Sequence, residues 1–448
     1  MSGPQPALVL SGSIGKGHDS VAEACASALA RAGYRSTVLD CMALLGGVGS
    51  RIGESVFRRM LAVPPLYDGF HFSQMRAGSP LAERMERAAA ARLVPRLRDV
   101  IARSGVQVLV SVFATGAGAL GRLRAELPGA RAVVVCTDAT AHRFWVHEGI
   151  DRYVVCSPAA AGTVRQYLPR ADVALVPPPV RPAFFAAPDR LAARRALGIH
   201  PAVRCVLVMA GGWGLAPIEG AATALARSGY RVLAVAGANA RLRRRLERAA
   251  RAVGSARGAP PGAAVDGAPP GAGGGPPGAG RPAGAVFTAG SGPGITVFGY
   301  TERVPELMAA ADVVVTSAGQ TCHEARVVGR PLVVLDVVPG HGRENLLLEL
   351  ARGGALACTP RPASVVAAVG ALLAGAAPAT EPWPVSDAAA WESRFLAVVA
   401  DLFPPAGRHR PGDAVATADG RDRMQPSRPP HGGADGDAAP SGEVASSR

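Results

Sequence analysis

The sequence predicts a two-domain α/β protein in which each domain is built on a parallel β-sheet and the two domains face a cleft. Short runs of apolar residues alternate with stretches of helical length along most of the chain. Strands that helices cover on both faces have this continuous apolar character. The alternation occurs twice, before and after the segment 177–182, so we expect two domains and not one large sheet.

The first domain is predicted over residues 1–176. Helix-length stretches such as Asp19–Ala32 and Leu81–Arg103 separate its strands. The strands themselves are expected at Ala7–Ser11, Ser36–Asp40, Val106–Val112, Ala132–Cys136, Arg152–Cys156 and Asp172–Val176.

A proline-rich segment separates this domain from the next. Residues 177–182 read Pro-Pro-Pro-Val-Arg-Pro, which can continue neither a helix nor a central strand, so a linker is expected over 177–187. The second domain then covers 188–375. Its strands are expected at Arg204–Ala210, Tyr230–Ala236, Ile295–Phe298, Asp312–Thr316, Pro331–Leu335 and Ala355–Cys358.

Two stretches interrupt the pattern. Residues 254–294 are rich in Gly, Pro and Ala without a period, which predicts a disordered insertion in one loop. Residues 404–448 are polar and rich in Pro and Gly, which predicts a disordered tail. Neither is expected to carry chemistry.

Composition restricts the class of protein. The net charge of +14 favours an anionic partner but does not separate phosphates from lipids or nucleic acid. Every basic side chain except Lys16 is an arginine. The seven cysteines form no Cys-x-x-Cys pair, which is typical of reduced thiols in a cytoplasmic protein. The start has no signal-peptide pattern, and the longest apolar run, 363–378, is too weak to span a bilayer. We therefore expect a soluble protein, or one bound to a membrane from outside.

A glycine-rich turn follows the first strand. Residues 11–19 read Ser-Gly-Ser-Ile-Gly-Lys-Gly-His-Asp, so Gly15 and Gly17 let the backbone approach a ligand in front of the next helix. This is not a Walker A loop, because Gly15-Lys16 is followed by Gly-His and not by Ser or Thr. His18 begins the helix where solvent and ligand can reach it, which favours a chemical role over a structural one.

An aromatic stretch at residues 64–72, Pro-Pro-Leu-Tyr-Asp-Gly-Phe-His-Phe, is preceded by Arg51, Arg58 and Arg59. Aromatic and apolar residues beside arginines suit an element that enters lipid headgroups. A helix that packs on the sheet with a solvated arginine face explains the same residues. Both interpretations stay open, with Tyr67 as the candidate lipid contact in the first.

Polar and aromatic residues also follow the fourth strand. Asp138, His142 and Trp145 lie on the short segment after Cys136. Ligands of open α/β sheets bind beyond the carboxyl ends of the strands, which favours a site here.

Three turns at strand ends in the second domain could hold a nucleotide. Backbone amides at such turns bind phosphate, and a carboxylate on the first helical turn accepts ribose hydroxyls. Their candidate residues are Gly211, Gly212 and Gly214; Ser317, Gly319, Gln320, Thr321 and Glu324; and Gly340, His341, Glu344 and Asn345.

These residues resemble those of the glycosyltransferases that glycosylate diacylglycerol, the processive diacylglycerol glucosyltransferases and the monogalactosyldiacylglycerol synthases. The likeness covers residues 7–375 without the insertion. It rests on Gly-x-Gly-His ending at His18, Pro-x-Leu-Tyr at Tyr67, Thr-Asp at Asp138 with His142 and Trp145, and Pro-Gly-x-x-x-Glu-Asn ending at Asn345.

The resemblance implies the GT-B fold, two Rossmann-like domains with the acceptor in the first and a UDP-sugar in the second. It implies inversion, no cofactor and no bound metal, and a last helix near 388–402, within residues 376–403, that returns to the first domain. By it, His18 is the catalytic base, Glu324 binds ribose, and Phe298, Gly299 and Tyr300 border the base of the nucleotide. Gly15, Lys16, Gly17, Tyr67, His142 and Trp145 are assigned to the acceptor or lipid.

The expected function is transfer of a hexose from a UDP-sugar to a membrane lipid, with His18 or Asp138 as base. The expected partners are the UDP-sugar, diacylglycerol or a related lipid, and the anionic inner face of the plasma membrane; nucleic acid is not expected. The sequence departs from the family pattern at two places. It has Ser317-Ala318-Gly319-Gln320 where the family has Lys-Pro-Gly-Gly, and His341-Gly342 where the family has Gln-Glu. These departures leave the identity of the donor sugar open. A UDP-sugar epimerase or hydrolase and a non-catalytic lipid- or nucleotide-binding protein remain alternatives.

Overall fold

The structure is a computed structural model that describes residues 5–13, 16–46, 71, 79–212, 216–255, 292–376 and 388–403. Most of the predicted insertion at 254–294 and all of the predicted tail lie outside these residues. So do Gly15, Tyr67, Gly214 and the arginines at 51–59, so those interpretations stay predictions.

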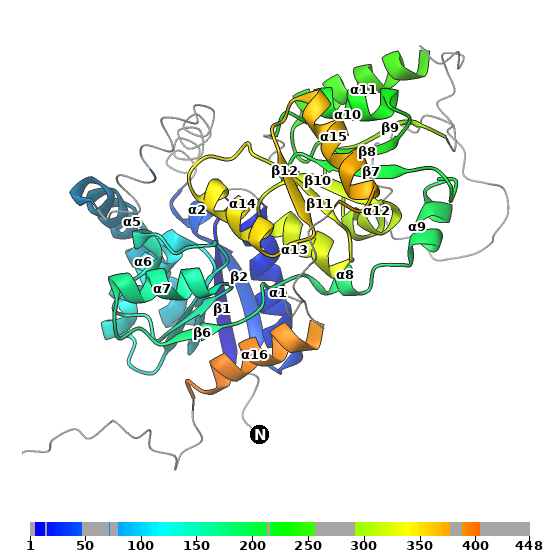
Figure 1. Cartoon of the computed structure of the whole chain (residues 1–448). Helices are drawn as coiled ribbons and strands as arrows, with labels where there is room; N and C mark the ends of the chain where they lie inside the picture. The colour runs from blue at the N-terminus through cyan, green and yellow to red at the C-terminus, as the bar shows by residue number, and fades with distance from the viewer. Residues whose placement is uncertain are drawn as a thin grey trace, which may run out of the picture. The chain divides into compact units, whose positions relative to one another are not determined.

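The first half of the chain forms a six-stranded parallel sheet with strand order β2-β1-β3-β4-β5-β6. Helices lie on both of its faces (Figure 1). The strands are β1 (Pro6–Ser11), β2 (Arg35–Asp40), β3 (Val108–Ser111), β4 (Arg131–Cys136), β5 (Arg152–Val155) and β6 (Val173–Leu175). The helices are α1 (Gly17–Arg31), α2 (Cys41–Leu44), α5 (Pro80–Ser104), α6 (Ala114–Leu123) and α7 (Pro158–Tyr167), with short 3₁₀ turns at Arg124–Glu126 and Arg143–Trp145.

The second half forms another six-stranded parallel sheet, with strand order β12-β11-β10-β7-β8-β9. Its strands are β7 (Cys205–Met209), β8 (Arg231–Val235), β9 (Gly294–Phe298), β10 (Val313–Ser317), β11 (Leu332–Leu335) and β12 (Ala355–Cys358). Its helices are α8 (Pro182–Phe185), α9 (Arg190–Ala196), α10 (Ile218–Arg227), α11 (Ala240–Ser255), α12 (Val304–Ala310), α13 (Gln320–Val327), α14 (His341–Ala351) and α15 (Pro362–Leu373).

The prediction of two parallel α/β sheets is confirmed. Every predicted strand occurs in the structure, and its ends differ from the predicted ones by at most two residues. Differences of this size are usual at the ends of secondary-structure elements. The central strands are buried on both faces, as their continuous apolar runs indicate; β3, β7 and β8 are buried along their whole length. The domain boundaries themselves stay a prediction.

Local sequence explains where the long helix α5 starts and stops. The hydroxyl of Ser79 accepts a hydrogen bond from the backbone N–H of Ala82, and Pro80 follows at the first helical position. The helix ends at Gly105, whose φ of 61° lies in the left-handed region that glycine adopts easily. Its apolar face, with Leu93 and Leu97, packs into the core beside the first sheet.

The last helix, α16 (Ala388–Ala400), packs on the first sheet, where it contacts α1 and β5. Trp391 and Phe395 are buried against Val9 and other side chains of that core. An ion pair of 2.6 Å between Arg31 and Glu392 joins the helix to the end of α1.

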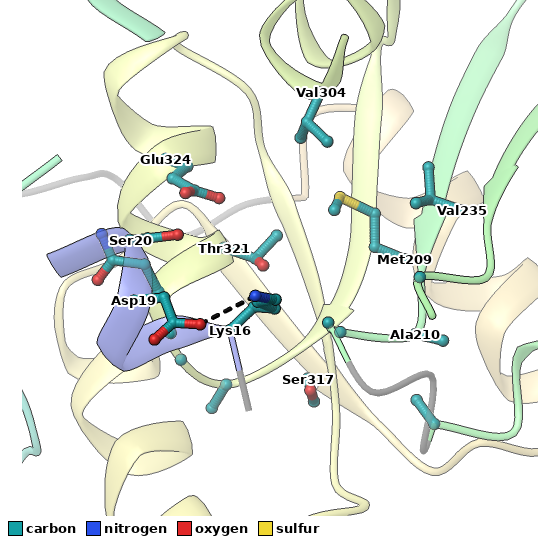
Figure 2. Close-up of a pocket in the computed structure, with 18 of the residues that line it drawn as sticks. Lys16, Asp19, Ser20, Met209, Ala210, Val235, Val304, Ser317, Thr321 and Glu324 are labelled. Carbon is teal, nitrogen blue, oxygen red and sulfur yellow. Dashed lines mark hydrogen bonds and ion pairs between the residues drawn. The ribbon is translucent and has the colours of Figure 1, made fainter. Parts of the chain in front are cut away.

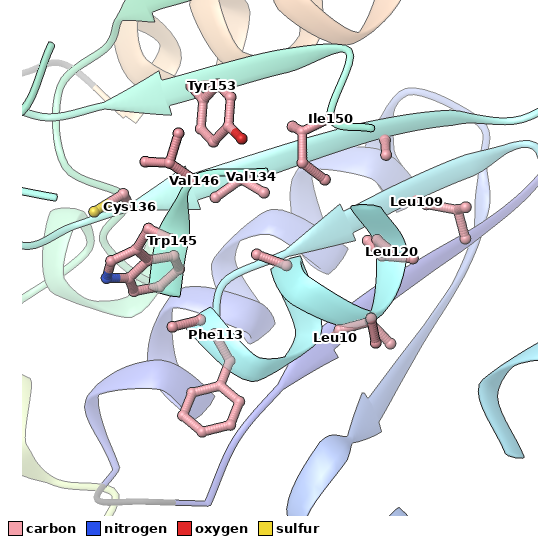
Figure 3. Close-up of a cluster of buried hydrophobic side chains, with 14 of the residues drawn as sticks. Leu10, Leu109, Phe113, Leu120, Val134, Cys136, Trp145, Val146, Ile150 and Tyr153 are labelled. Carbon is pink, nitrogen blue, oxygen red and sulfur yellow. The ribbon is translucent and has the colours of Figure 1, made fainter. Parts of the chain in front are cut away.

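A cluster of buried hydrophobic side chains holds the loop after β4 in place (Figure 3). Trp145 lies in it with Phe113, and Tyr153 of β5 is fully buried nearby. The hydroxyl of Tyr153 donates to the carbonyl of His147 at 2.8 Å and accepts from its N–H at 2.7 Å. The loop that carries Asp138 and His142 is therefore attached to the core at its far end.

The longest apolar run forms helix α15, which buries Val365, Val369 and Leu372 against the second sheet. Among the described residues, no helix has both the length and the apolar character needed to cross a membrane.

Candidate active site

A cavity of about 450 Å³ lies where the carboxyl ends of both sheets meet (Figure 2). Its walls come from the turns after β1, β7, β8, β9, β10 and β11 and from the segment that joins the two halves. The lining residues used below are Lys16, Gly17, Asp19, Glu23, Arg181, Gly211, Gly212, Tyr300, Ser317, Gly319, Gln320, Thr321, Glu324 and His341. Ligands bind at this edge in open α/β sheets, so this cavity is the candidate site.

The turn after β1 presents Lys16 to the cavity. The ammonium Nζ donates to Oδ2 of Asp19 at 3.0 Å, while Oδ1 of Asp19 accepts from the hydroxyl of Ser11 at 2.8 Å. The hydrogen bond to Asp19 is the main reason that the pKa of Lys16 is raised above its ordinary value. Lys16 therefore remains a cation at neutral pH.

His18 is the second residue of α1 and does not itself line the cavity, although Gly17 and Asp19 on either side of it do. Its Nδ1 lies 2.8 Å from the carbonyl oxygen of Val112. Because a carbonyl oxygen can only accept, Nδ1 carries the proton, and in the neutral ring the lone pair is on Nε2. The imidazole is thus held in the tautomer that a general base requires. Its ring packs beside Phe113 at 5.3 Å and Trp145 at 6.3 Å between ring centroids.

Asp138 is partly buried at the end of β4 and is less suited to act as the base. Its Oδ2 accepts from the indole N–H of Trp145 at 3.1 Å. Burial disfavours the charged form, but the nearby His341, His142 and His18, with the Trp145 hydrogen bond, outweigh it and lower the pKa of the carboxyl. A carboxylate with a lowered pKa is a weak proton acceptor.

Trp145 itself is buried in the core, so it supports Asp138 and His18 and has no free face for a lipid. Its assignment to the acceptor is therefore indirect.

His142 lies in a cluster of imidazoles. Its ring centroid is 6.2 Å from that of His71, and the ring of His71 is 6.0 Å from that of His341. Burial lowers the pKa of His142 to about 3 and also lowers the pKa of His341, so both rings are neutral near pH 7.

The turn after β7 needs its glycines. Gly211 has a φ of 73°, in the left-handed region. A Cβ atom on Gly212 would lie 2.6 Å from Cγ and 3.2 Å from the backbone nitrogen of Lys16. The two glycine turns, one from each sheet, are therefore in direct contact.

The turn after β10 leads into α13 and contains Ser317, Gly319, Gln320 and Thr321, all of which line the cavity. The side-chain amide of Gln320 donates to the carbonyl of Pro179 at 2.7 Å. Gln320 is thus bonded to the segment that joins the halves, and Ser317 and Thr321 keep hydroxyls toward the cavity (Figure 2).

Glu324 lies one turn further along α13 and is only 6% exposed. Among the described residues, none donates a hydrogen bond to its carboxylate, although it lines the cavity. Burial raises the pKa of Glu324 to about 8, with Arg181 acting in the opposite direction. A buried carboxyl without a donor on a cavity wall is suited to a ligand that supplies hydroxyl groups.

The residues at the start of α14 separate into two groups. His341 lines the cavity, and Gly340 with a φ of 60° precedes it. Glu344 instead accepts from the hydroxyl of Thr140 at 2.6 Å, and Asn345 accepts from the backbone N–H of Ala139 at 2.7 Å. These two side chains join the second half to the loop after β4, and their assignment to the donor sugar stays a prediction.

The turn after β9 also differs from its expected use. Phe298 is buried in the core and Gly299 is not on the cavity wall, whereas Tyr300 lines the cavity and is 59% exposed. The Tyr300 hydroxyl donates to Glu302 at 2.7 Å. Of this group, only Tyr300 presents its side chain to the cavity.

Asp19 and Arg181 line the cavity and were not predicted from the sequence. Arg181 lies 3.2 Å from Glu302 and 3.7 Å from Glu23. Asp19 could have been predicted from the sequence, because its spacing of three residues from Lys16 at the start of a helix favours an ion pair. No sequence pattern predicts a place in the site for Arg181, since it lies among the prolines that indicate a linker.

The expectation that no metal is bound stays a prediction. Across the part of the chain that the structure describes, no three His, Cys, Asp or Glu side chains are arranged to hold a metal ion.

The sequence is similar to enzymes that glycosylate diacylglycerol. The family model for monogalactosyldiacylglycerol (MGDG) synthase matches residues 18–170. A probable monogalactosyldiacylglycerol synthase 2 from Oryza sativa subsp. indica is 26% identical over 246 residues, 52% of this chain and 44% of the relative. A processive diacylglycerol beta-glucosyltransferase from Bacillus subtilis is 24% identical over 226 residues, 50% of this chain and 49% of the relative. The chain thus spans about half the length of the curated relatives it matches.

Solved structures identify the fold. A UDP-glucosyltransferase from Polygonum tinctorium superposes with a TM-score of 0.52 at 14% identity, over 90% of this chain and 94% of the other. A UDP-GlcNAc 2-epimerase from Neisseria meningitidis superposes with a TM-score of 0.50 at 10% identity, over 89% and 99%. The fold is GT-B, as expected, and the same fold occurs in a transferase and in an epimerase.

Proposed function

We propose that this chain, whose sequence is similar to the diacylglycerol glycosyltransferases, moves a hexose from a UDP-sugar to a hydroxyl of a membrane lipid. Diacylglycerol is the proposed acceptor, because the relatives named above are diacylglycerol glucosyltransferases and monogalactosyldiacylglycerol synthases. The reaction is proposed to occur at the inner face of the plasma membrane, with the protein bound peripherally to anionic lipid.

The observation that carries the proposal is the buried carboxyl of Glu324 on the cavity wall. Among the described residues, none donates a hydrogen bond to this carboxyl. A buried carboxyl without a donor destabilises the folded protein. The two vicinal hydroxyls of a ribose would supply the missing donors. A nucleotide bound there would direct its phosphates toward the turn that begins α13.

The turns at Gly211–Gly212 and Ser317–Thr321 support a diphosphate leaving group. Backbone amides of glycine turns and of helix starts stabilise negative charge without a metal. Both turns line the same cavity.

The proposed chemistry is a single displacement with His18 as base. The acceptor hydroxyl gives its proton to Nε2 of His18, and its oxygen forms a bond to the anomeric carbon. The bond from that carbon to the β-phosphate oxygen breaks, and its electron pair leaves with UDP. One displacement inverts the anomeric configuration.

Turnover with lipid vesicles tests this function. The protein is incubated with vesicles that contain diacylglycerol and with UDP-glucose, UDP-galactose or UDP-GlcNAc in turn. We expect UDP release and a new glycolipid with at least one donor, both dependent on diacylglycerol. Conversion or hydrolysis of the sugar nucleotide without lipid would instead identify an epimerase or hydrolase. Binding of UDP without any turnover would identify a non-catalytic protein.

Replacing Glu324 should weaken nucleotide binding. Two hydrogen bonds from ribose to a carboxylate are worth roughly 1.5–3 kcal/mol, so Glu324→Ala should reduce UDP affinity about tenfold or more. Calorimetry with UDP measures this, and vesicle binding should not change. Glu306→Gln, which alters a carboxylate paired with Arg303 at 2.7 Å outside the cavity wall, is the matched control. Equal UDP affinity for Glu324→Ala and the control would refute the assignment.

The raised pKa of Glu324 predicts that nucleoside binding releases a proton. Because this pKa is about 8, the carboxyl of the free protein is mostly protonated at pH 7. Ribose hydroxyls that donate to it favour the charged form, so uridine affinity should rise as pH increases from about 6.5 towards 8. Calorimetry in buffers of different ionisation enthalpy measures the released proton, and uridine avoids titration of phosphate. Glu324→Gln should abolish the release; persistence of the full release in that variant would contradict the prediction.

A further inference from the structure

We propose that Lys16, a residue of the first half of the chain, binds the diphosphate of the nucleotide that the second half holds. The sequence assigns Lys16 to the acceptor or lipid and leaves phosphate as the alternative ligand. The geometry points instead to the donor, because the ammonium of Lys16 faces a cavity that turns of the second half also line. This inference rests on the proposed function and adds a residue to it.

The first support is the contact between the two glycine turns. Gly212 has no room for a side chain because Cγ of Lys16 would lie 2.6 Å from its Cβ. The backbone nitrogen of Lys16 would lie 3.2 Å from the same atom. Because backbone as well as side-chain atoms make this contact, Lys16 stays beside the Gly211–Gly212 turn in any rotamer of its outer side chain.

The second support is that the ammonium has capacity left for a ligand. A lysine ammonium has three N–H donors, and among the described residues only Asp19 accepts one of them. The side chain is 52% exposed, toward the cavity that it lines (Figure 2). Two N–H groups can therefore reach a phosphate oxygen without breaking the pair with Asp19.

The third support is the position of the surrounding groups. Thr321 and Ser317, from the other turn proposed to bind phosphate, line the cavity with Lys16 (Figure 2). Tyr300 covers another side, with its ring centroid 6.0 Å from the ammonium. Lys16 thus lies among the residues proposed to bind nucleotide.

The consequence concerns both catalysis and domain closure. As the sugar–phosphate bond breaks, negative charge grows on the β-phosphate oxygen, and a fixed ammonium stabilises it. Because Lys16 belongs to the first half and the phosphate turns to the second, a bound diphosphate would connect the two. A nucleoside without phosphate would not make this connection.

Comparison of UDP with uridine tests the inference. Lys16→Met removes the charge and keeps the side-chain length; it should weaken UDP binding roughly tenfold and leave uridine binding unchanged. Lys16→Arg should recover most of the loss because it restores a cation. Arg31→Met, which removes a cation that is paired with Glu392 at the far end of α1, is the control and should leave both affinities unchanged.

Selective labelling gives a second measurement, because Lys16 is the only lysine in the sequence. Acetylation of its amine, followed by mass spectrometry of the peptide, should be slowed by UDP and not by uridine. Vesicles of phosphatidylglycerol and phosphatidylcholine should bind Lys16→Met as they bind the unaltered protein.

The outcomes separate this inference from the proposed function. If the unaltered protein binds neither UDP nor uridine, the proposed function fails and the inference with it. If it binds UDP but Lys16→Met keeps the same ratio of UDP to uridine affinity, only the inference is overturned. Loss of vesicle binding in Lys16→Met with unchanged UDP affinity overturns it as well, in favour of a lipid headgroup.

Discussion

His18→Ala is expected to lower kcat by about 10²–10⁴ with UDP-sugar and lipid saturating, the usual contribution of a general base. The carbonyl of Val112 holds the proton on Nδ1, which leaves Nε2 to accept the proton of the acceptor hydroxyl. UDP affinity should hardly change, because the proposed nucleotide site is built mainly from the second half. Steady-state kinetics and UDP calorimetry on the same protein measure both quantities.

Asp138→Asn tests whether Asp138 is the base in place of His18. It keeps an acceptor for the indole N–H of Trp145 and removes the charge, so the local structure should survive. We expect a much smaller loss of kcat than for His18→Ala. Near-normal turnover of His18→Ala together with a large loss in Asp138→Asn would make Asp138 the base and His18 a structural residue.

Asp312→Ala is expected to destabilise the second half by about 3–5 kcal/mol, the cost of leaving a buried charge without its partner. Arg194 is 1% exposed, and its guanidinium donates to Oδ2 of Asp312 at 2.8 Å. The same oxygen accepts from the backbone N–H of Cys205, also at 2.8 Å. Asp312 thereby joins the starts of β7 and β10, the two strands whose far ends carry the proposed phosphate turns.

Hydrogen exchange measures this effect where it is expected. Peptides that cover Cys205–Met209 and Val313–Ser317 should lose protection in Asp312→Ala, while peptides of the first sheet should not. Glu126→Ala removes the partner of Arg98 in an exposed ion pair and should leave exchange unchanged, as surface pairs usually contribute little. Equal protection in Asp312→Ala and the control would contradict the assignment of Asp312 as a buried structural carboxylate.

Much of the fold could be predicted from the sequence because its signals are local. An apolar run such as Val206–Met209 is continuous in the sequence and buried on both faces in the sheet. Glycines at strand ends, such as Gly17 and Gly211, predict turns because the required backbone is local as well. Polar residues that follow the end of a strand lie at the ligand-binding edge of the sheet. The position of Glu324 after a predicted strand therefore indicates a binding role from the sequence alone.

Only the tertiary structure decided how the two halves share one site. The spacing of residues in sequence does not show that Lys16 contacts Gly212, because that contact joins turns from different sheets. For the same reason, the sequence does not show that the carboxylate of Glu344 accepts a hydrogen bond from Thr140 of the first half. The sequence by itself determined the strands, the turns and the candidate residues on them, since hydrophobic pattern and backbone preference act over a few positions. Which of those side chains meet, and which are left buried without a partner, depends on the packing of one sheet against the other, where side-chain direction and desolvation act across the whole chain.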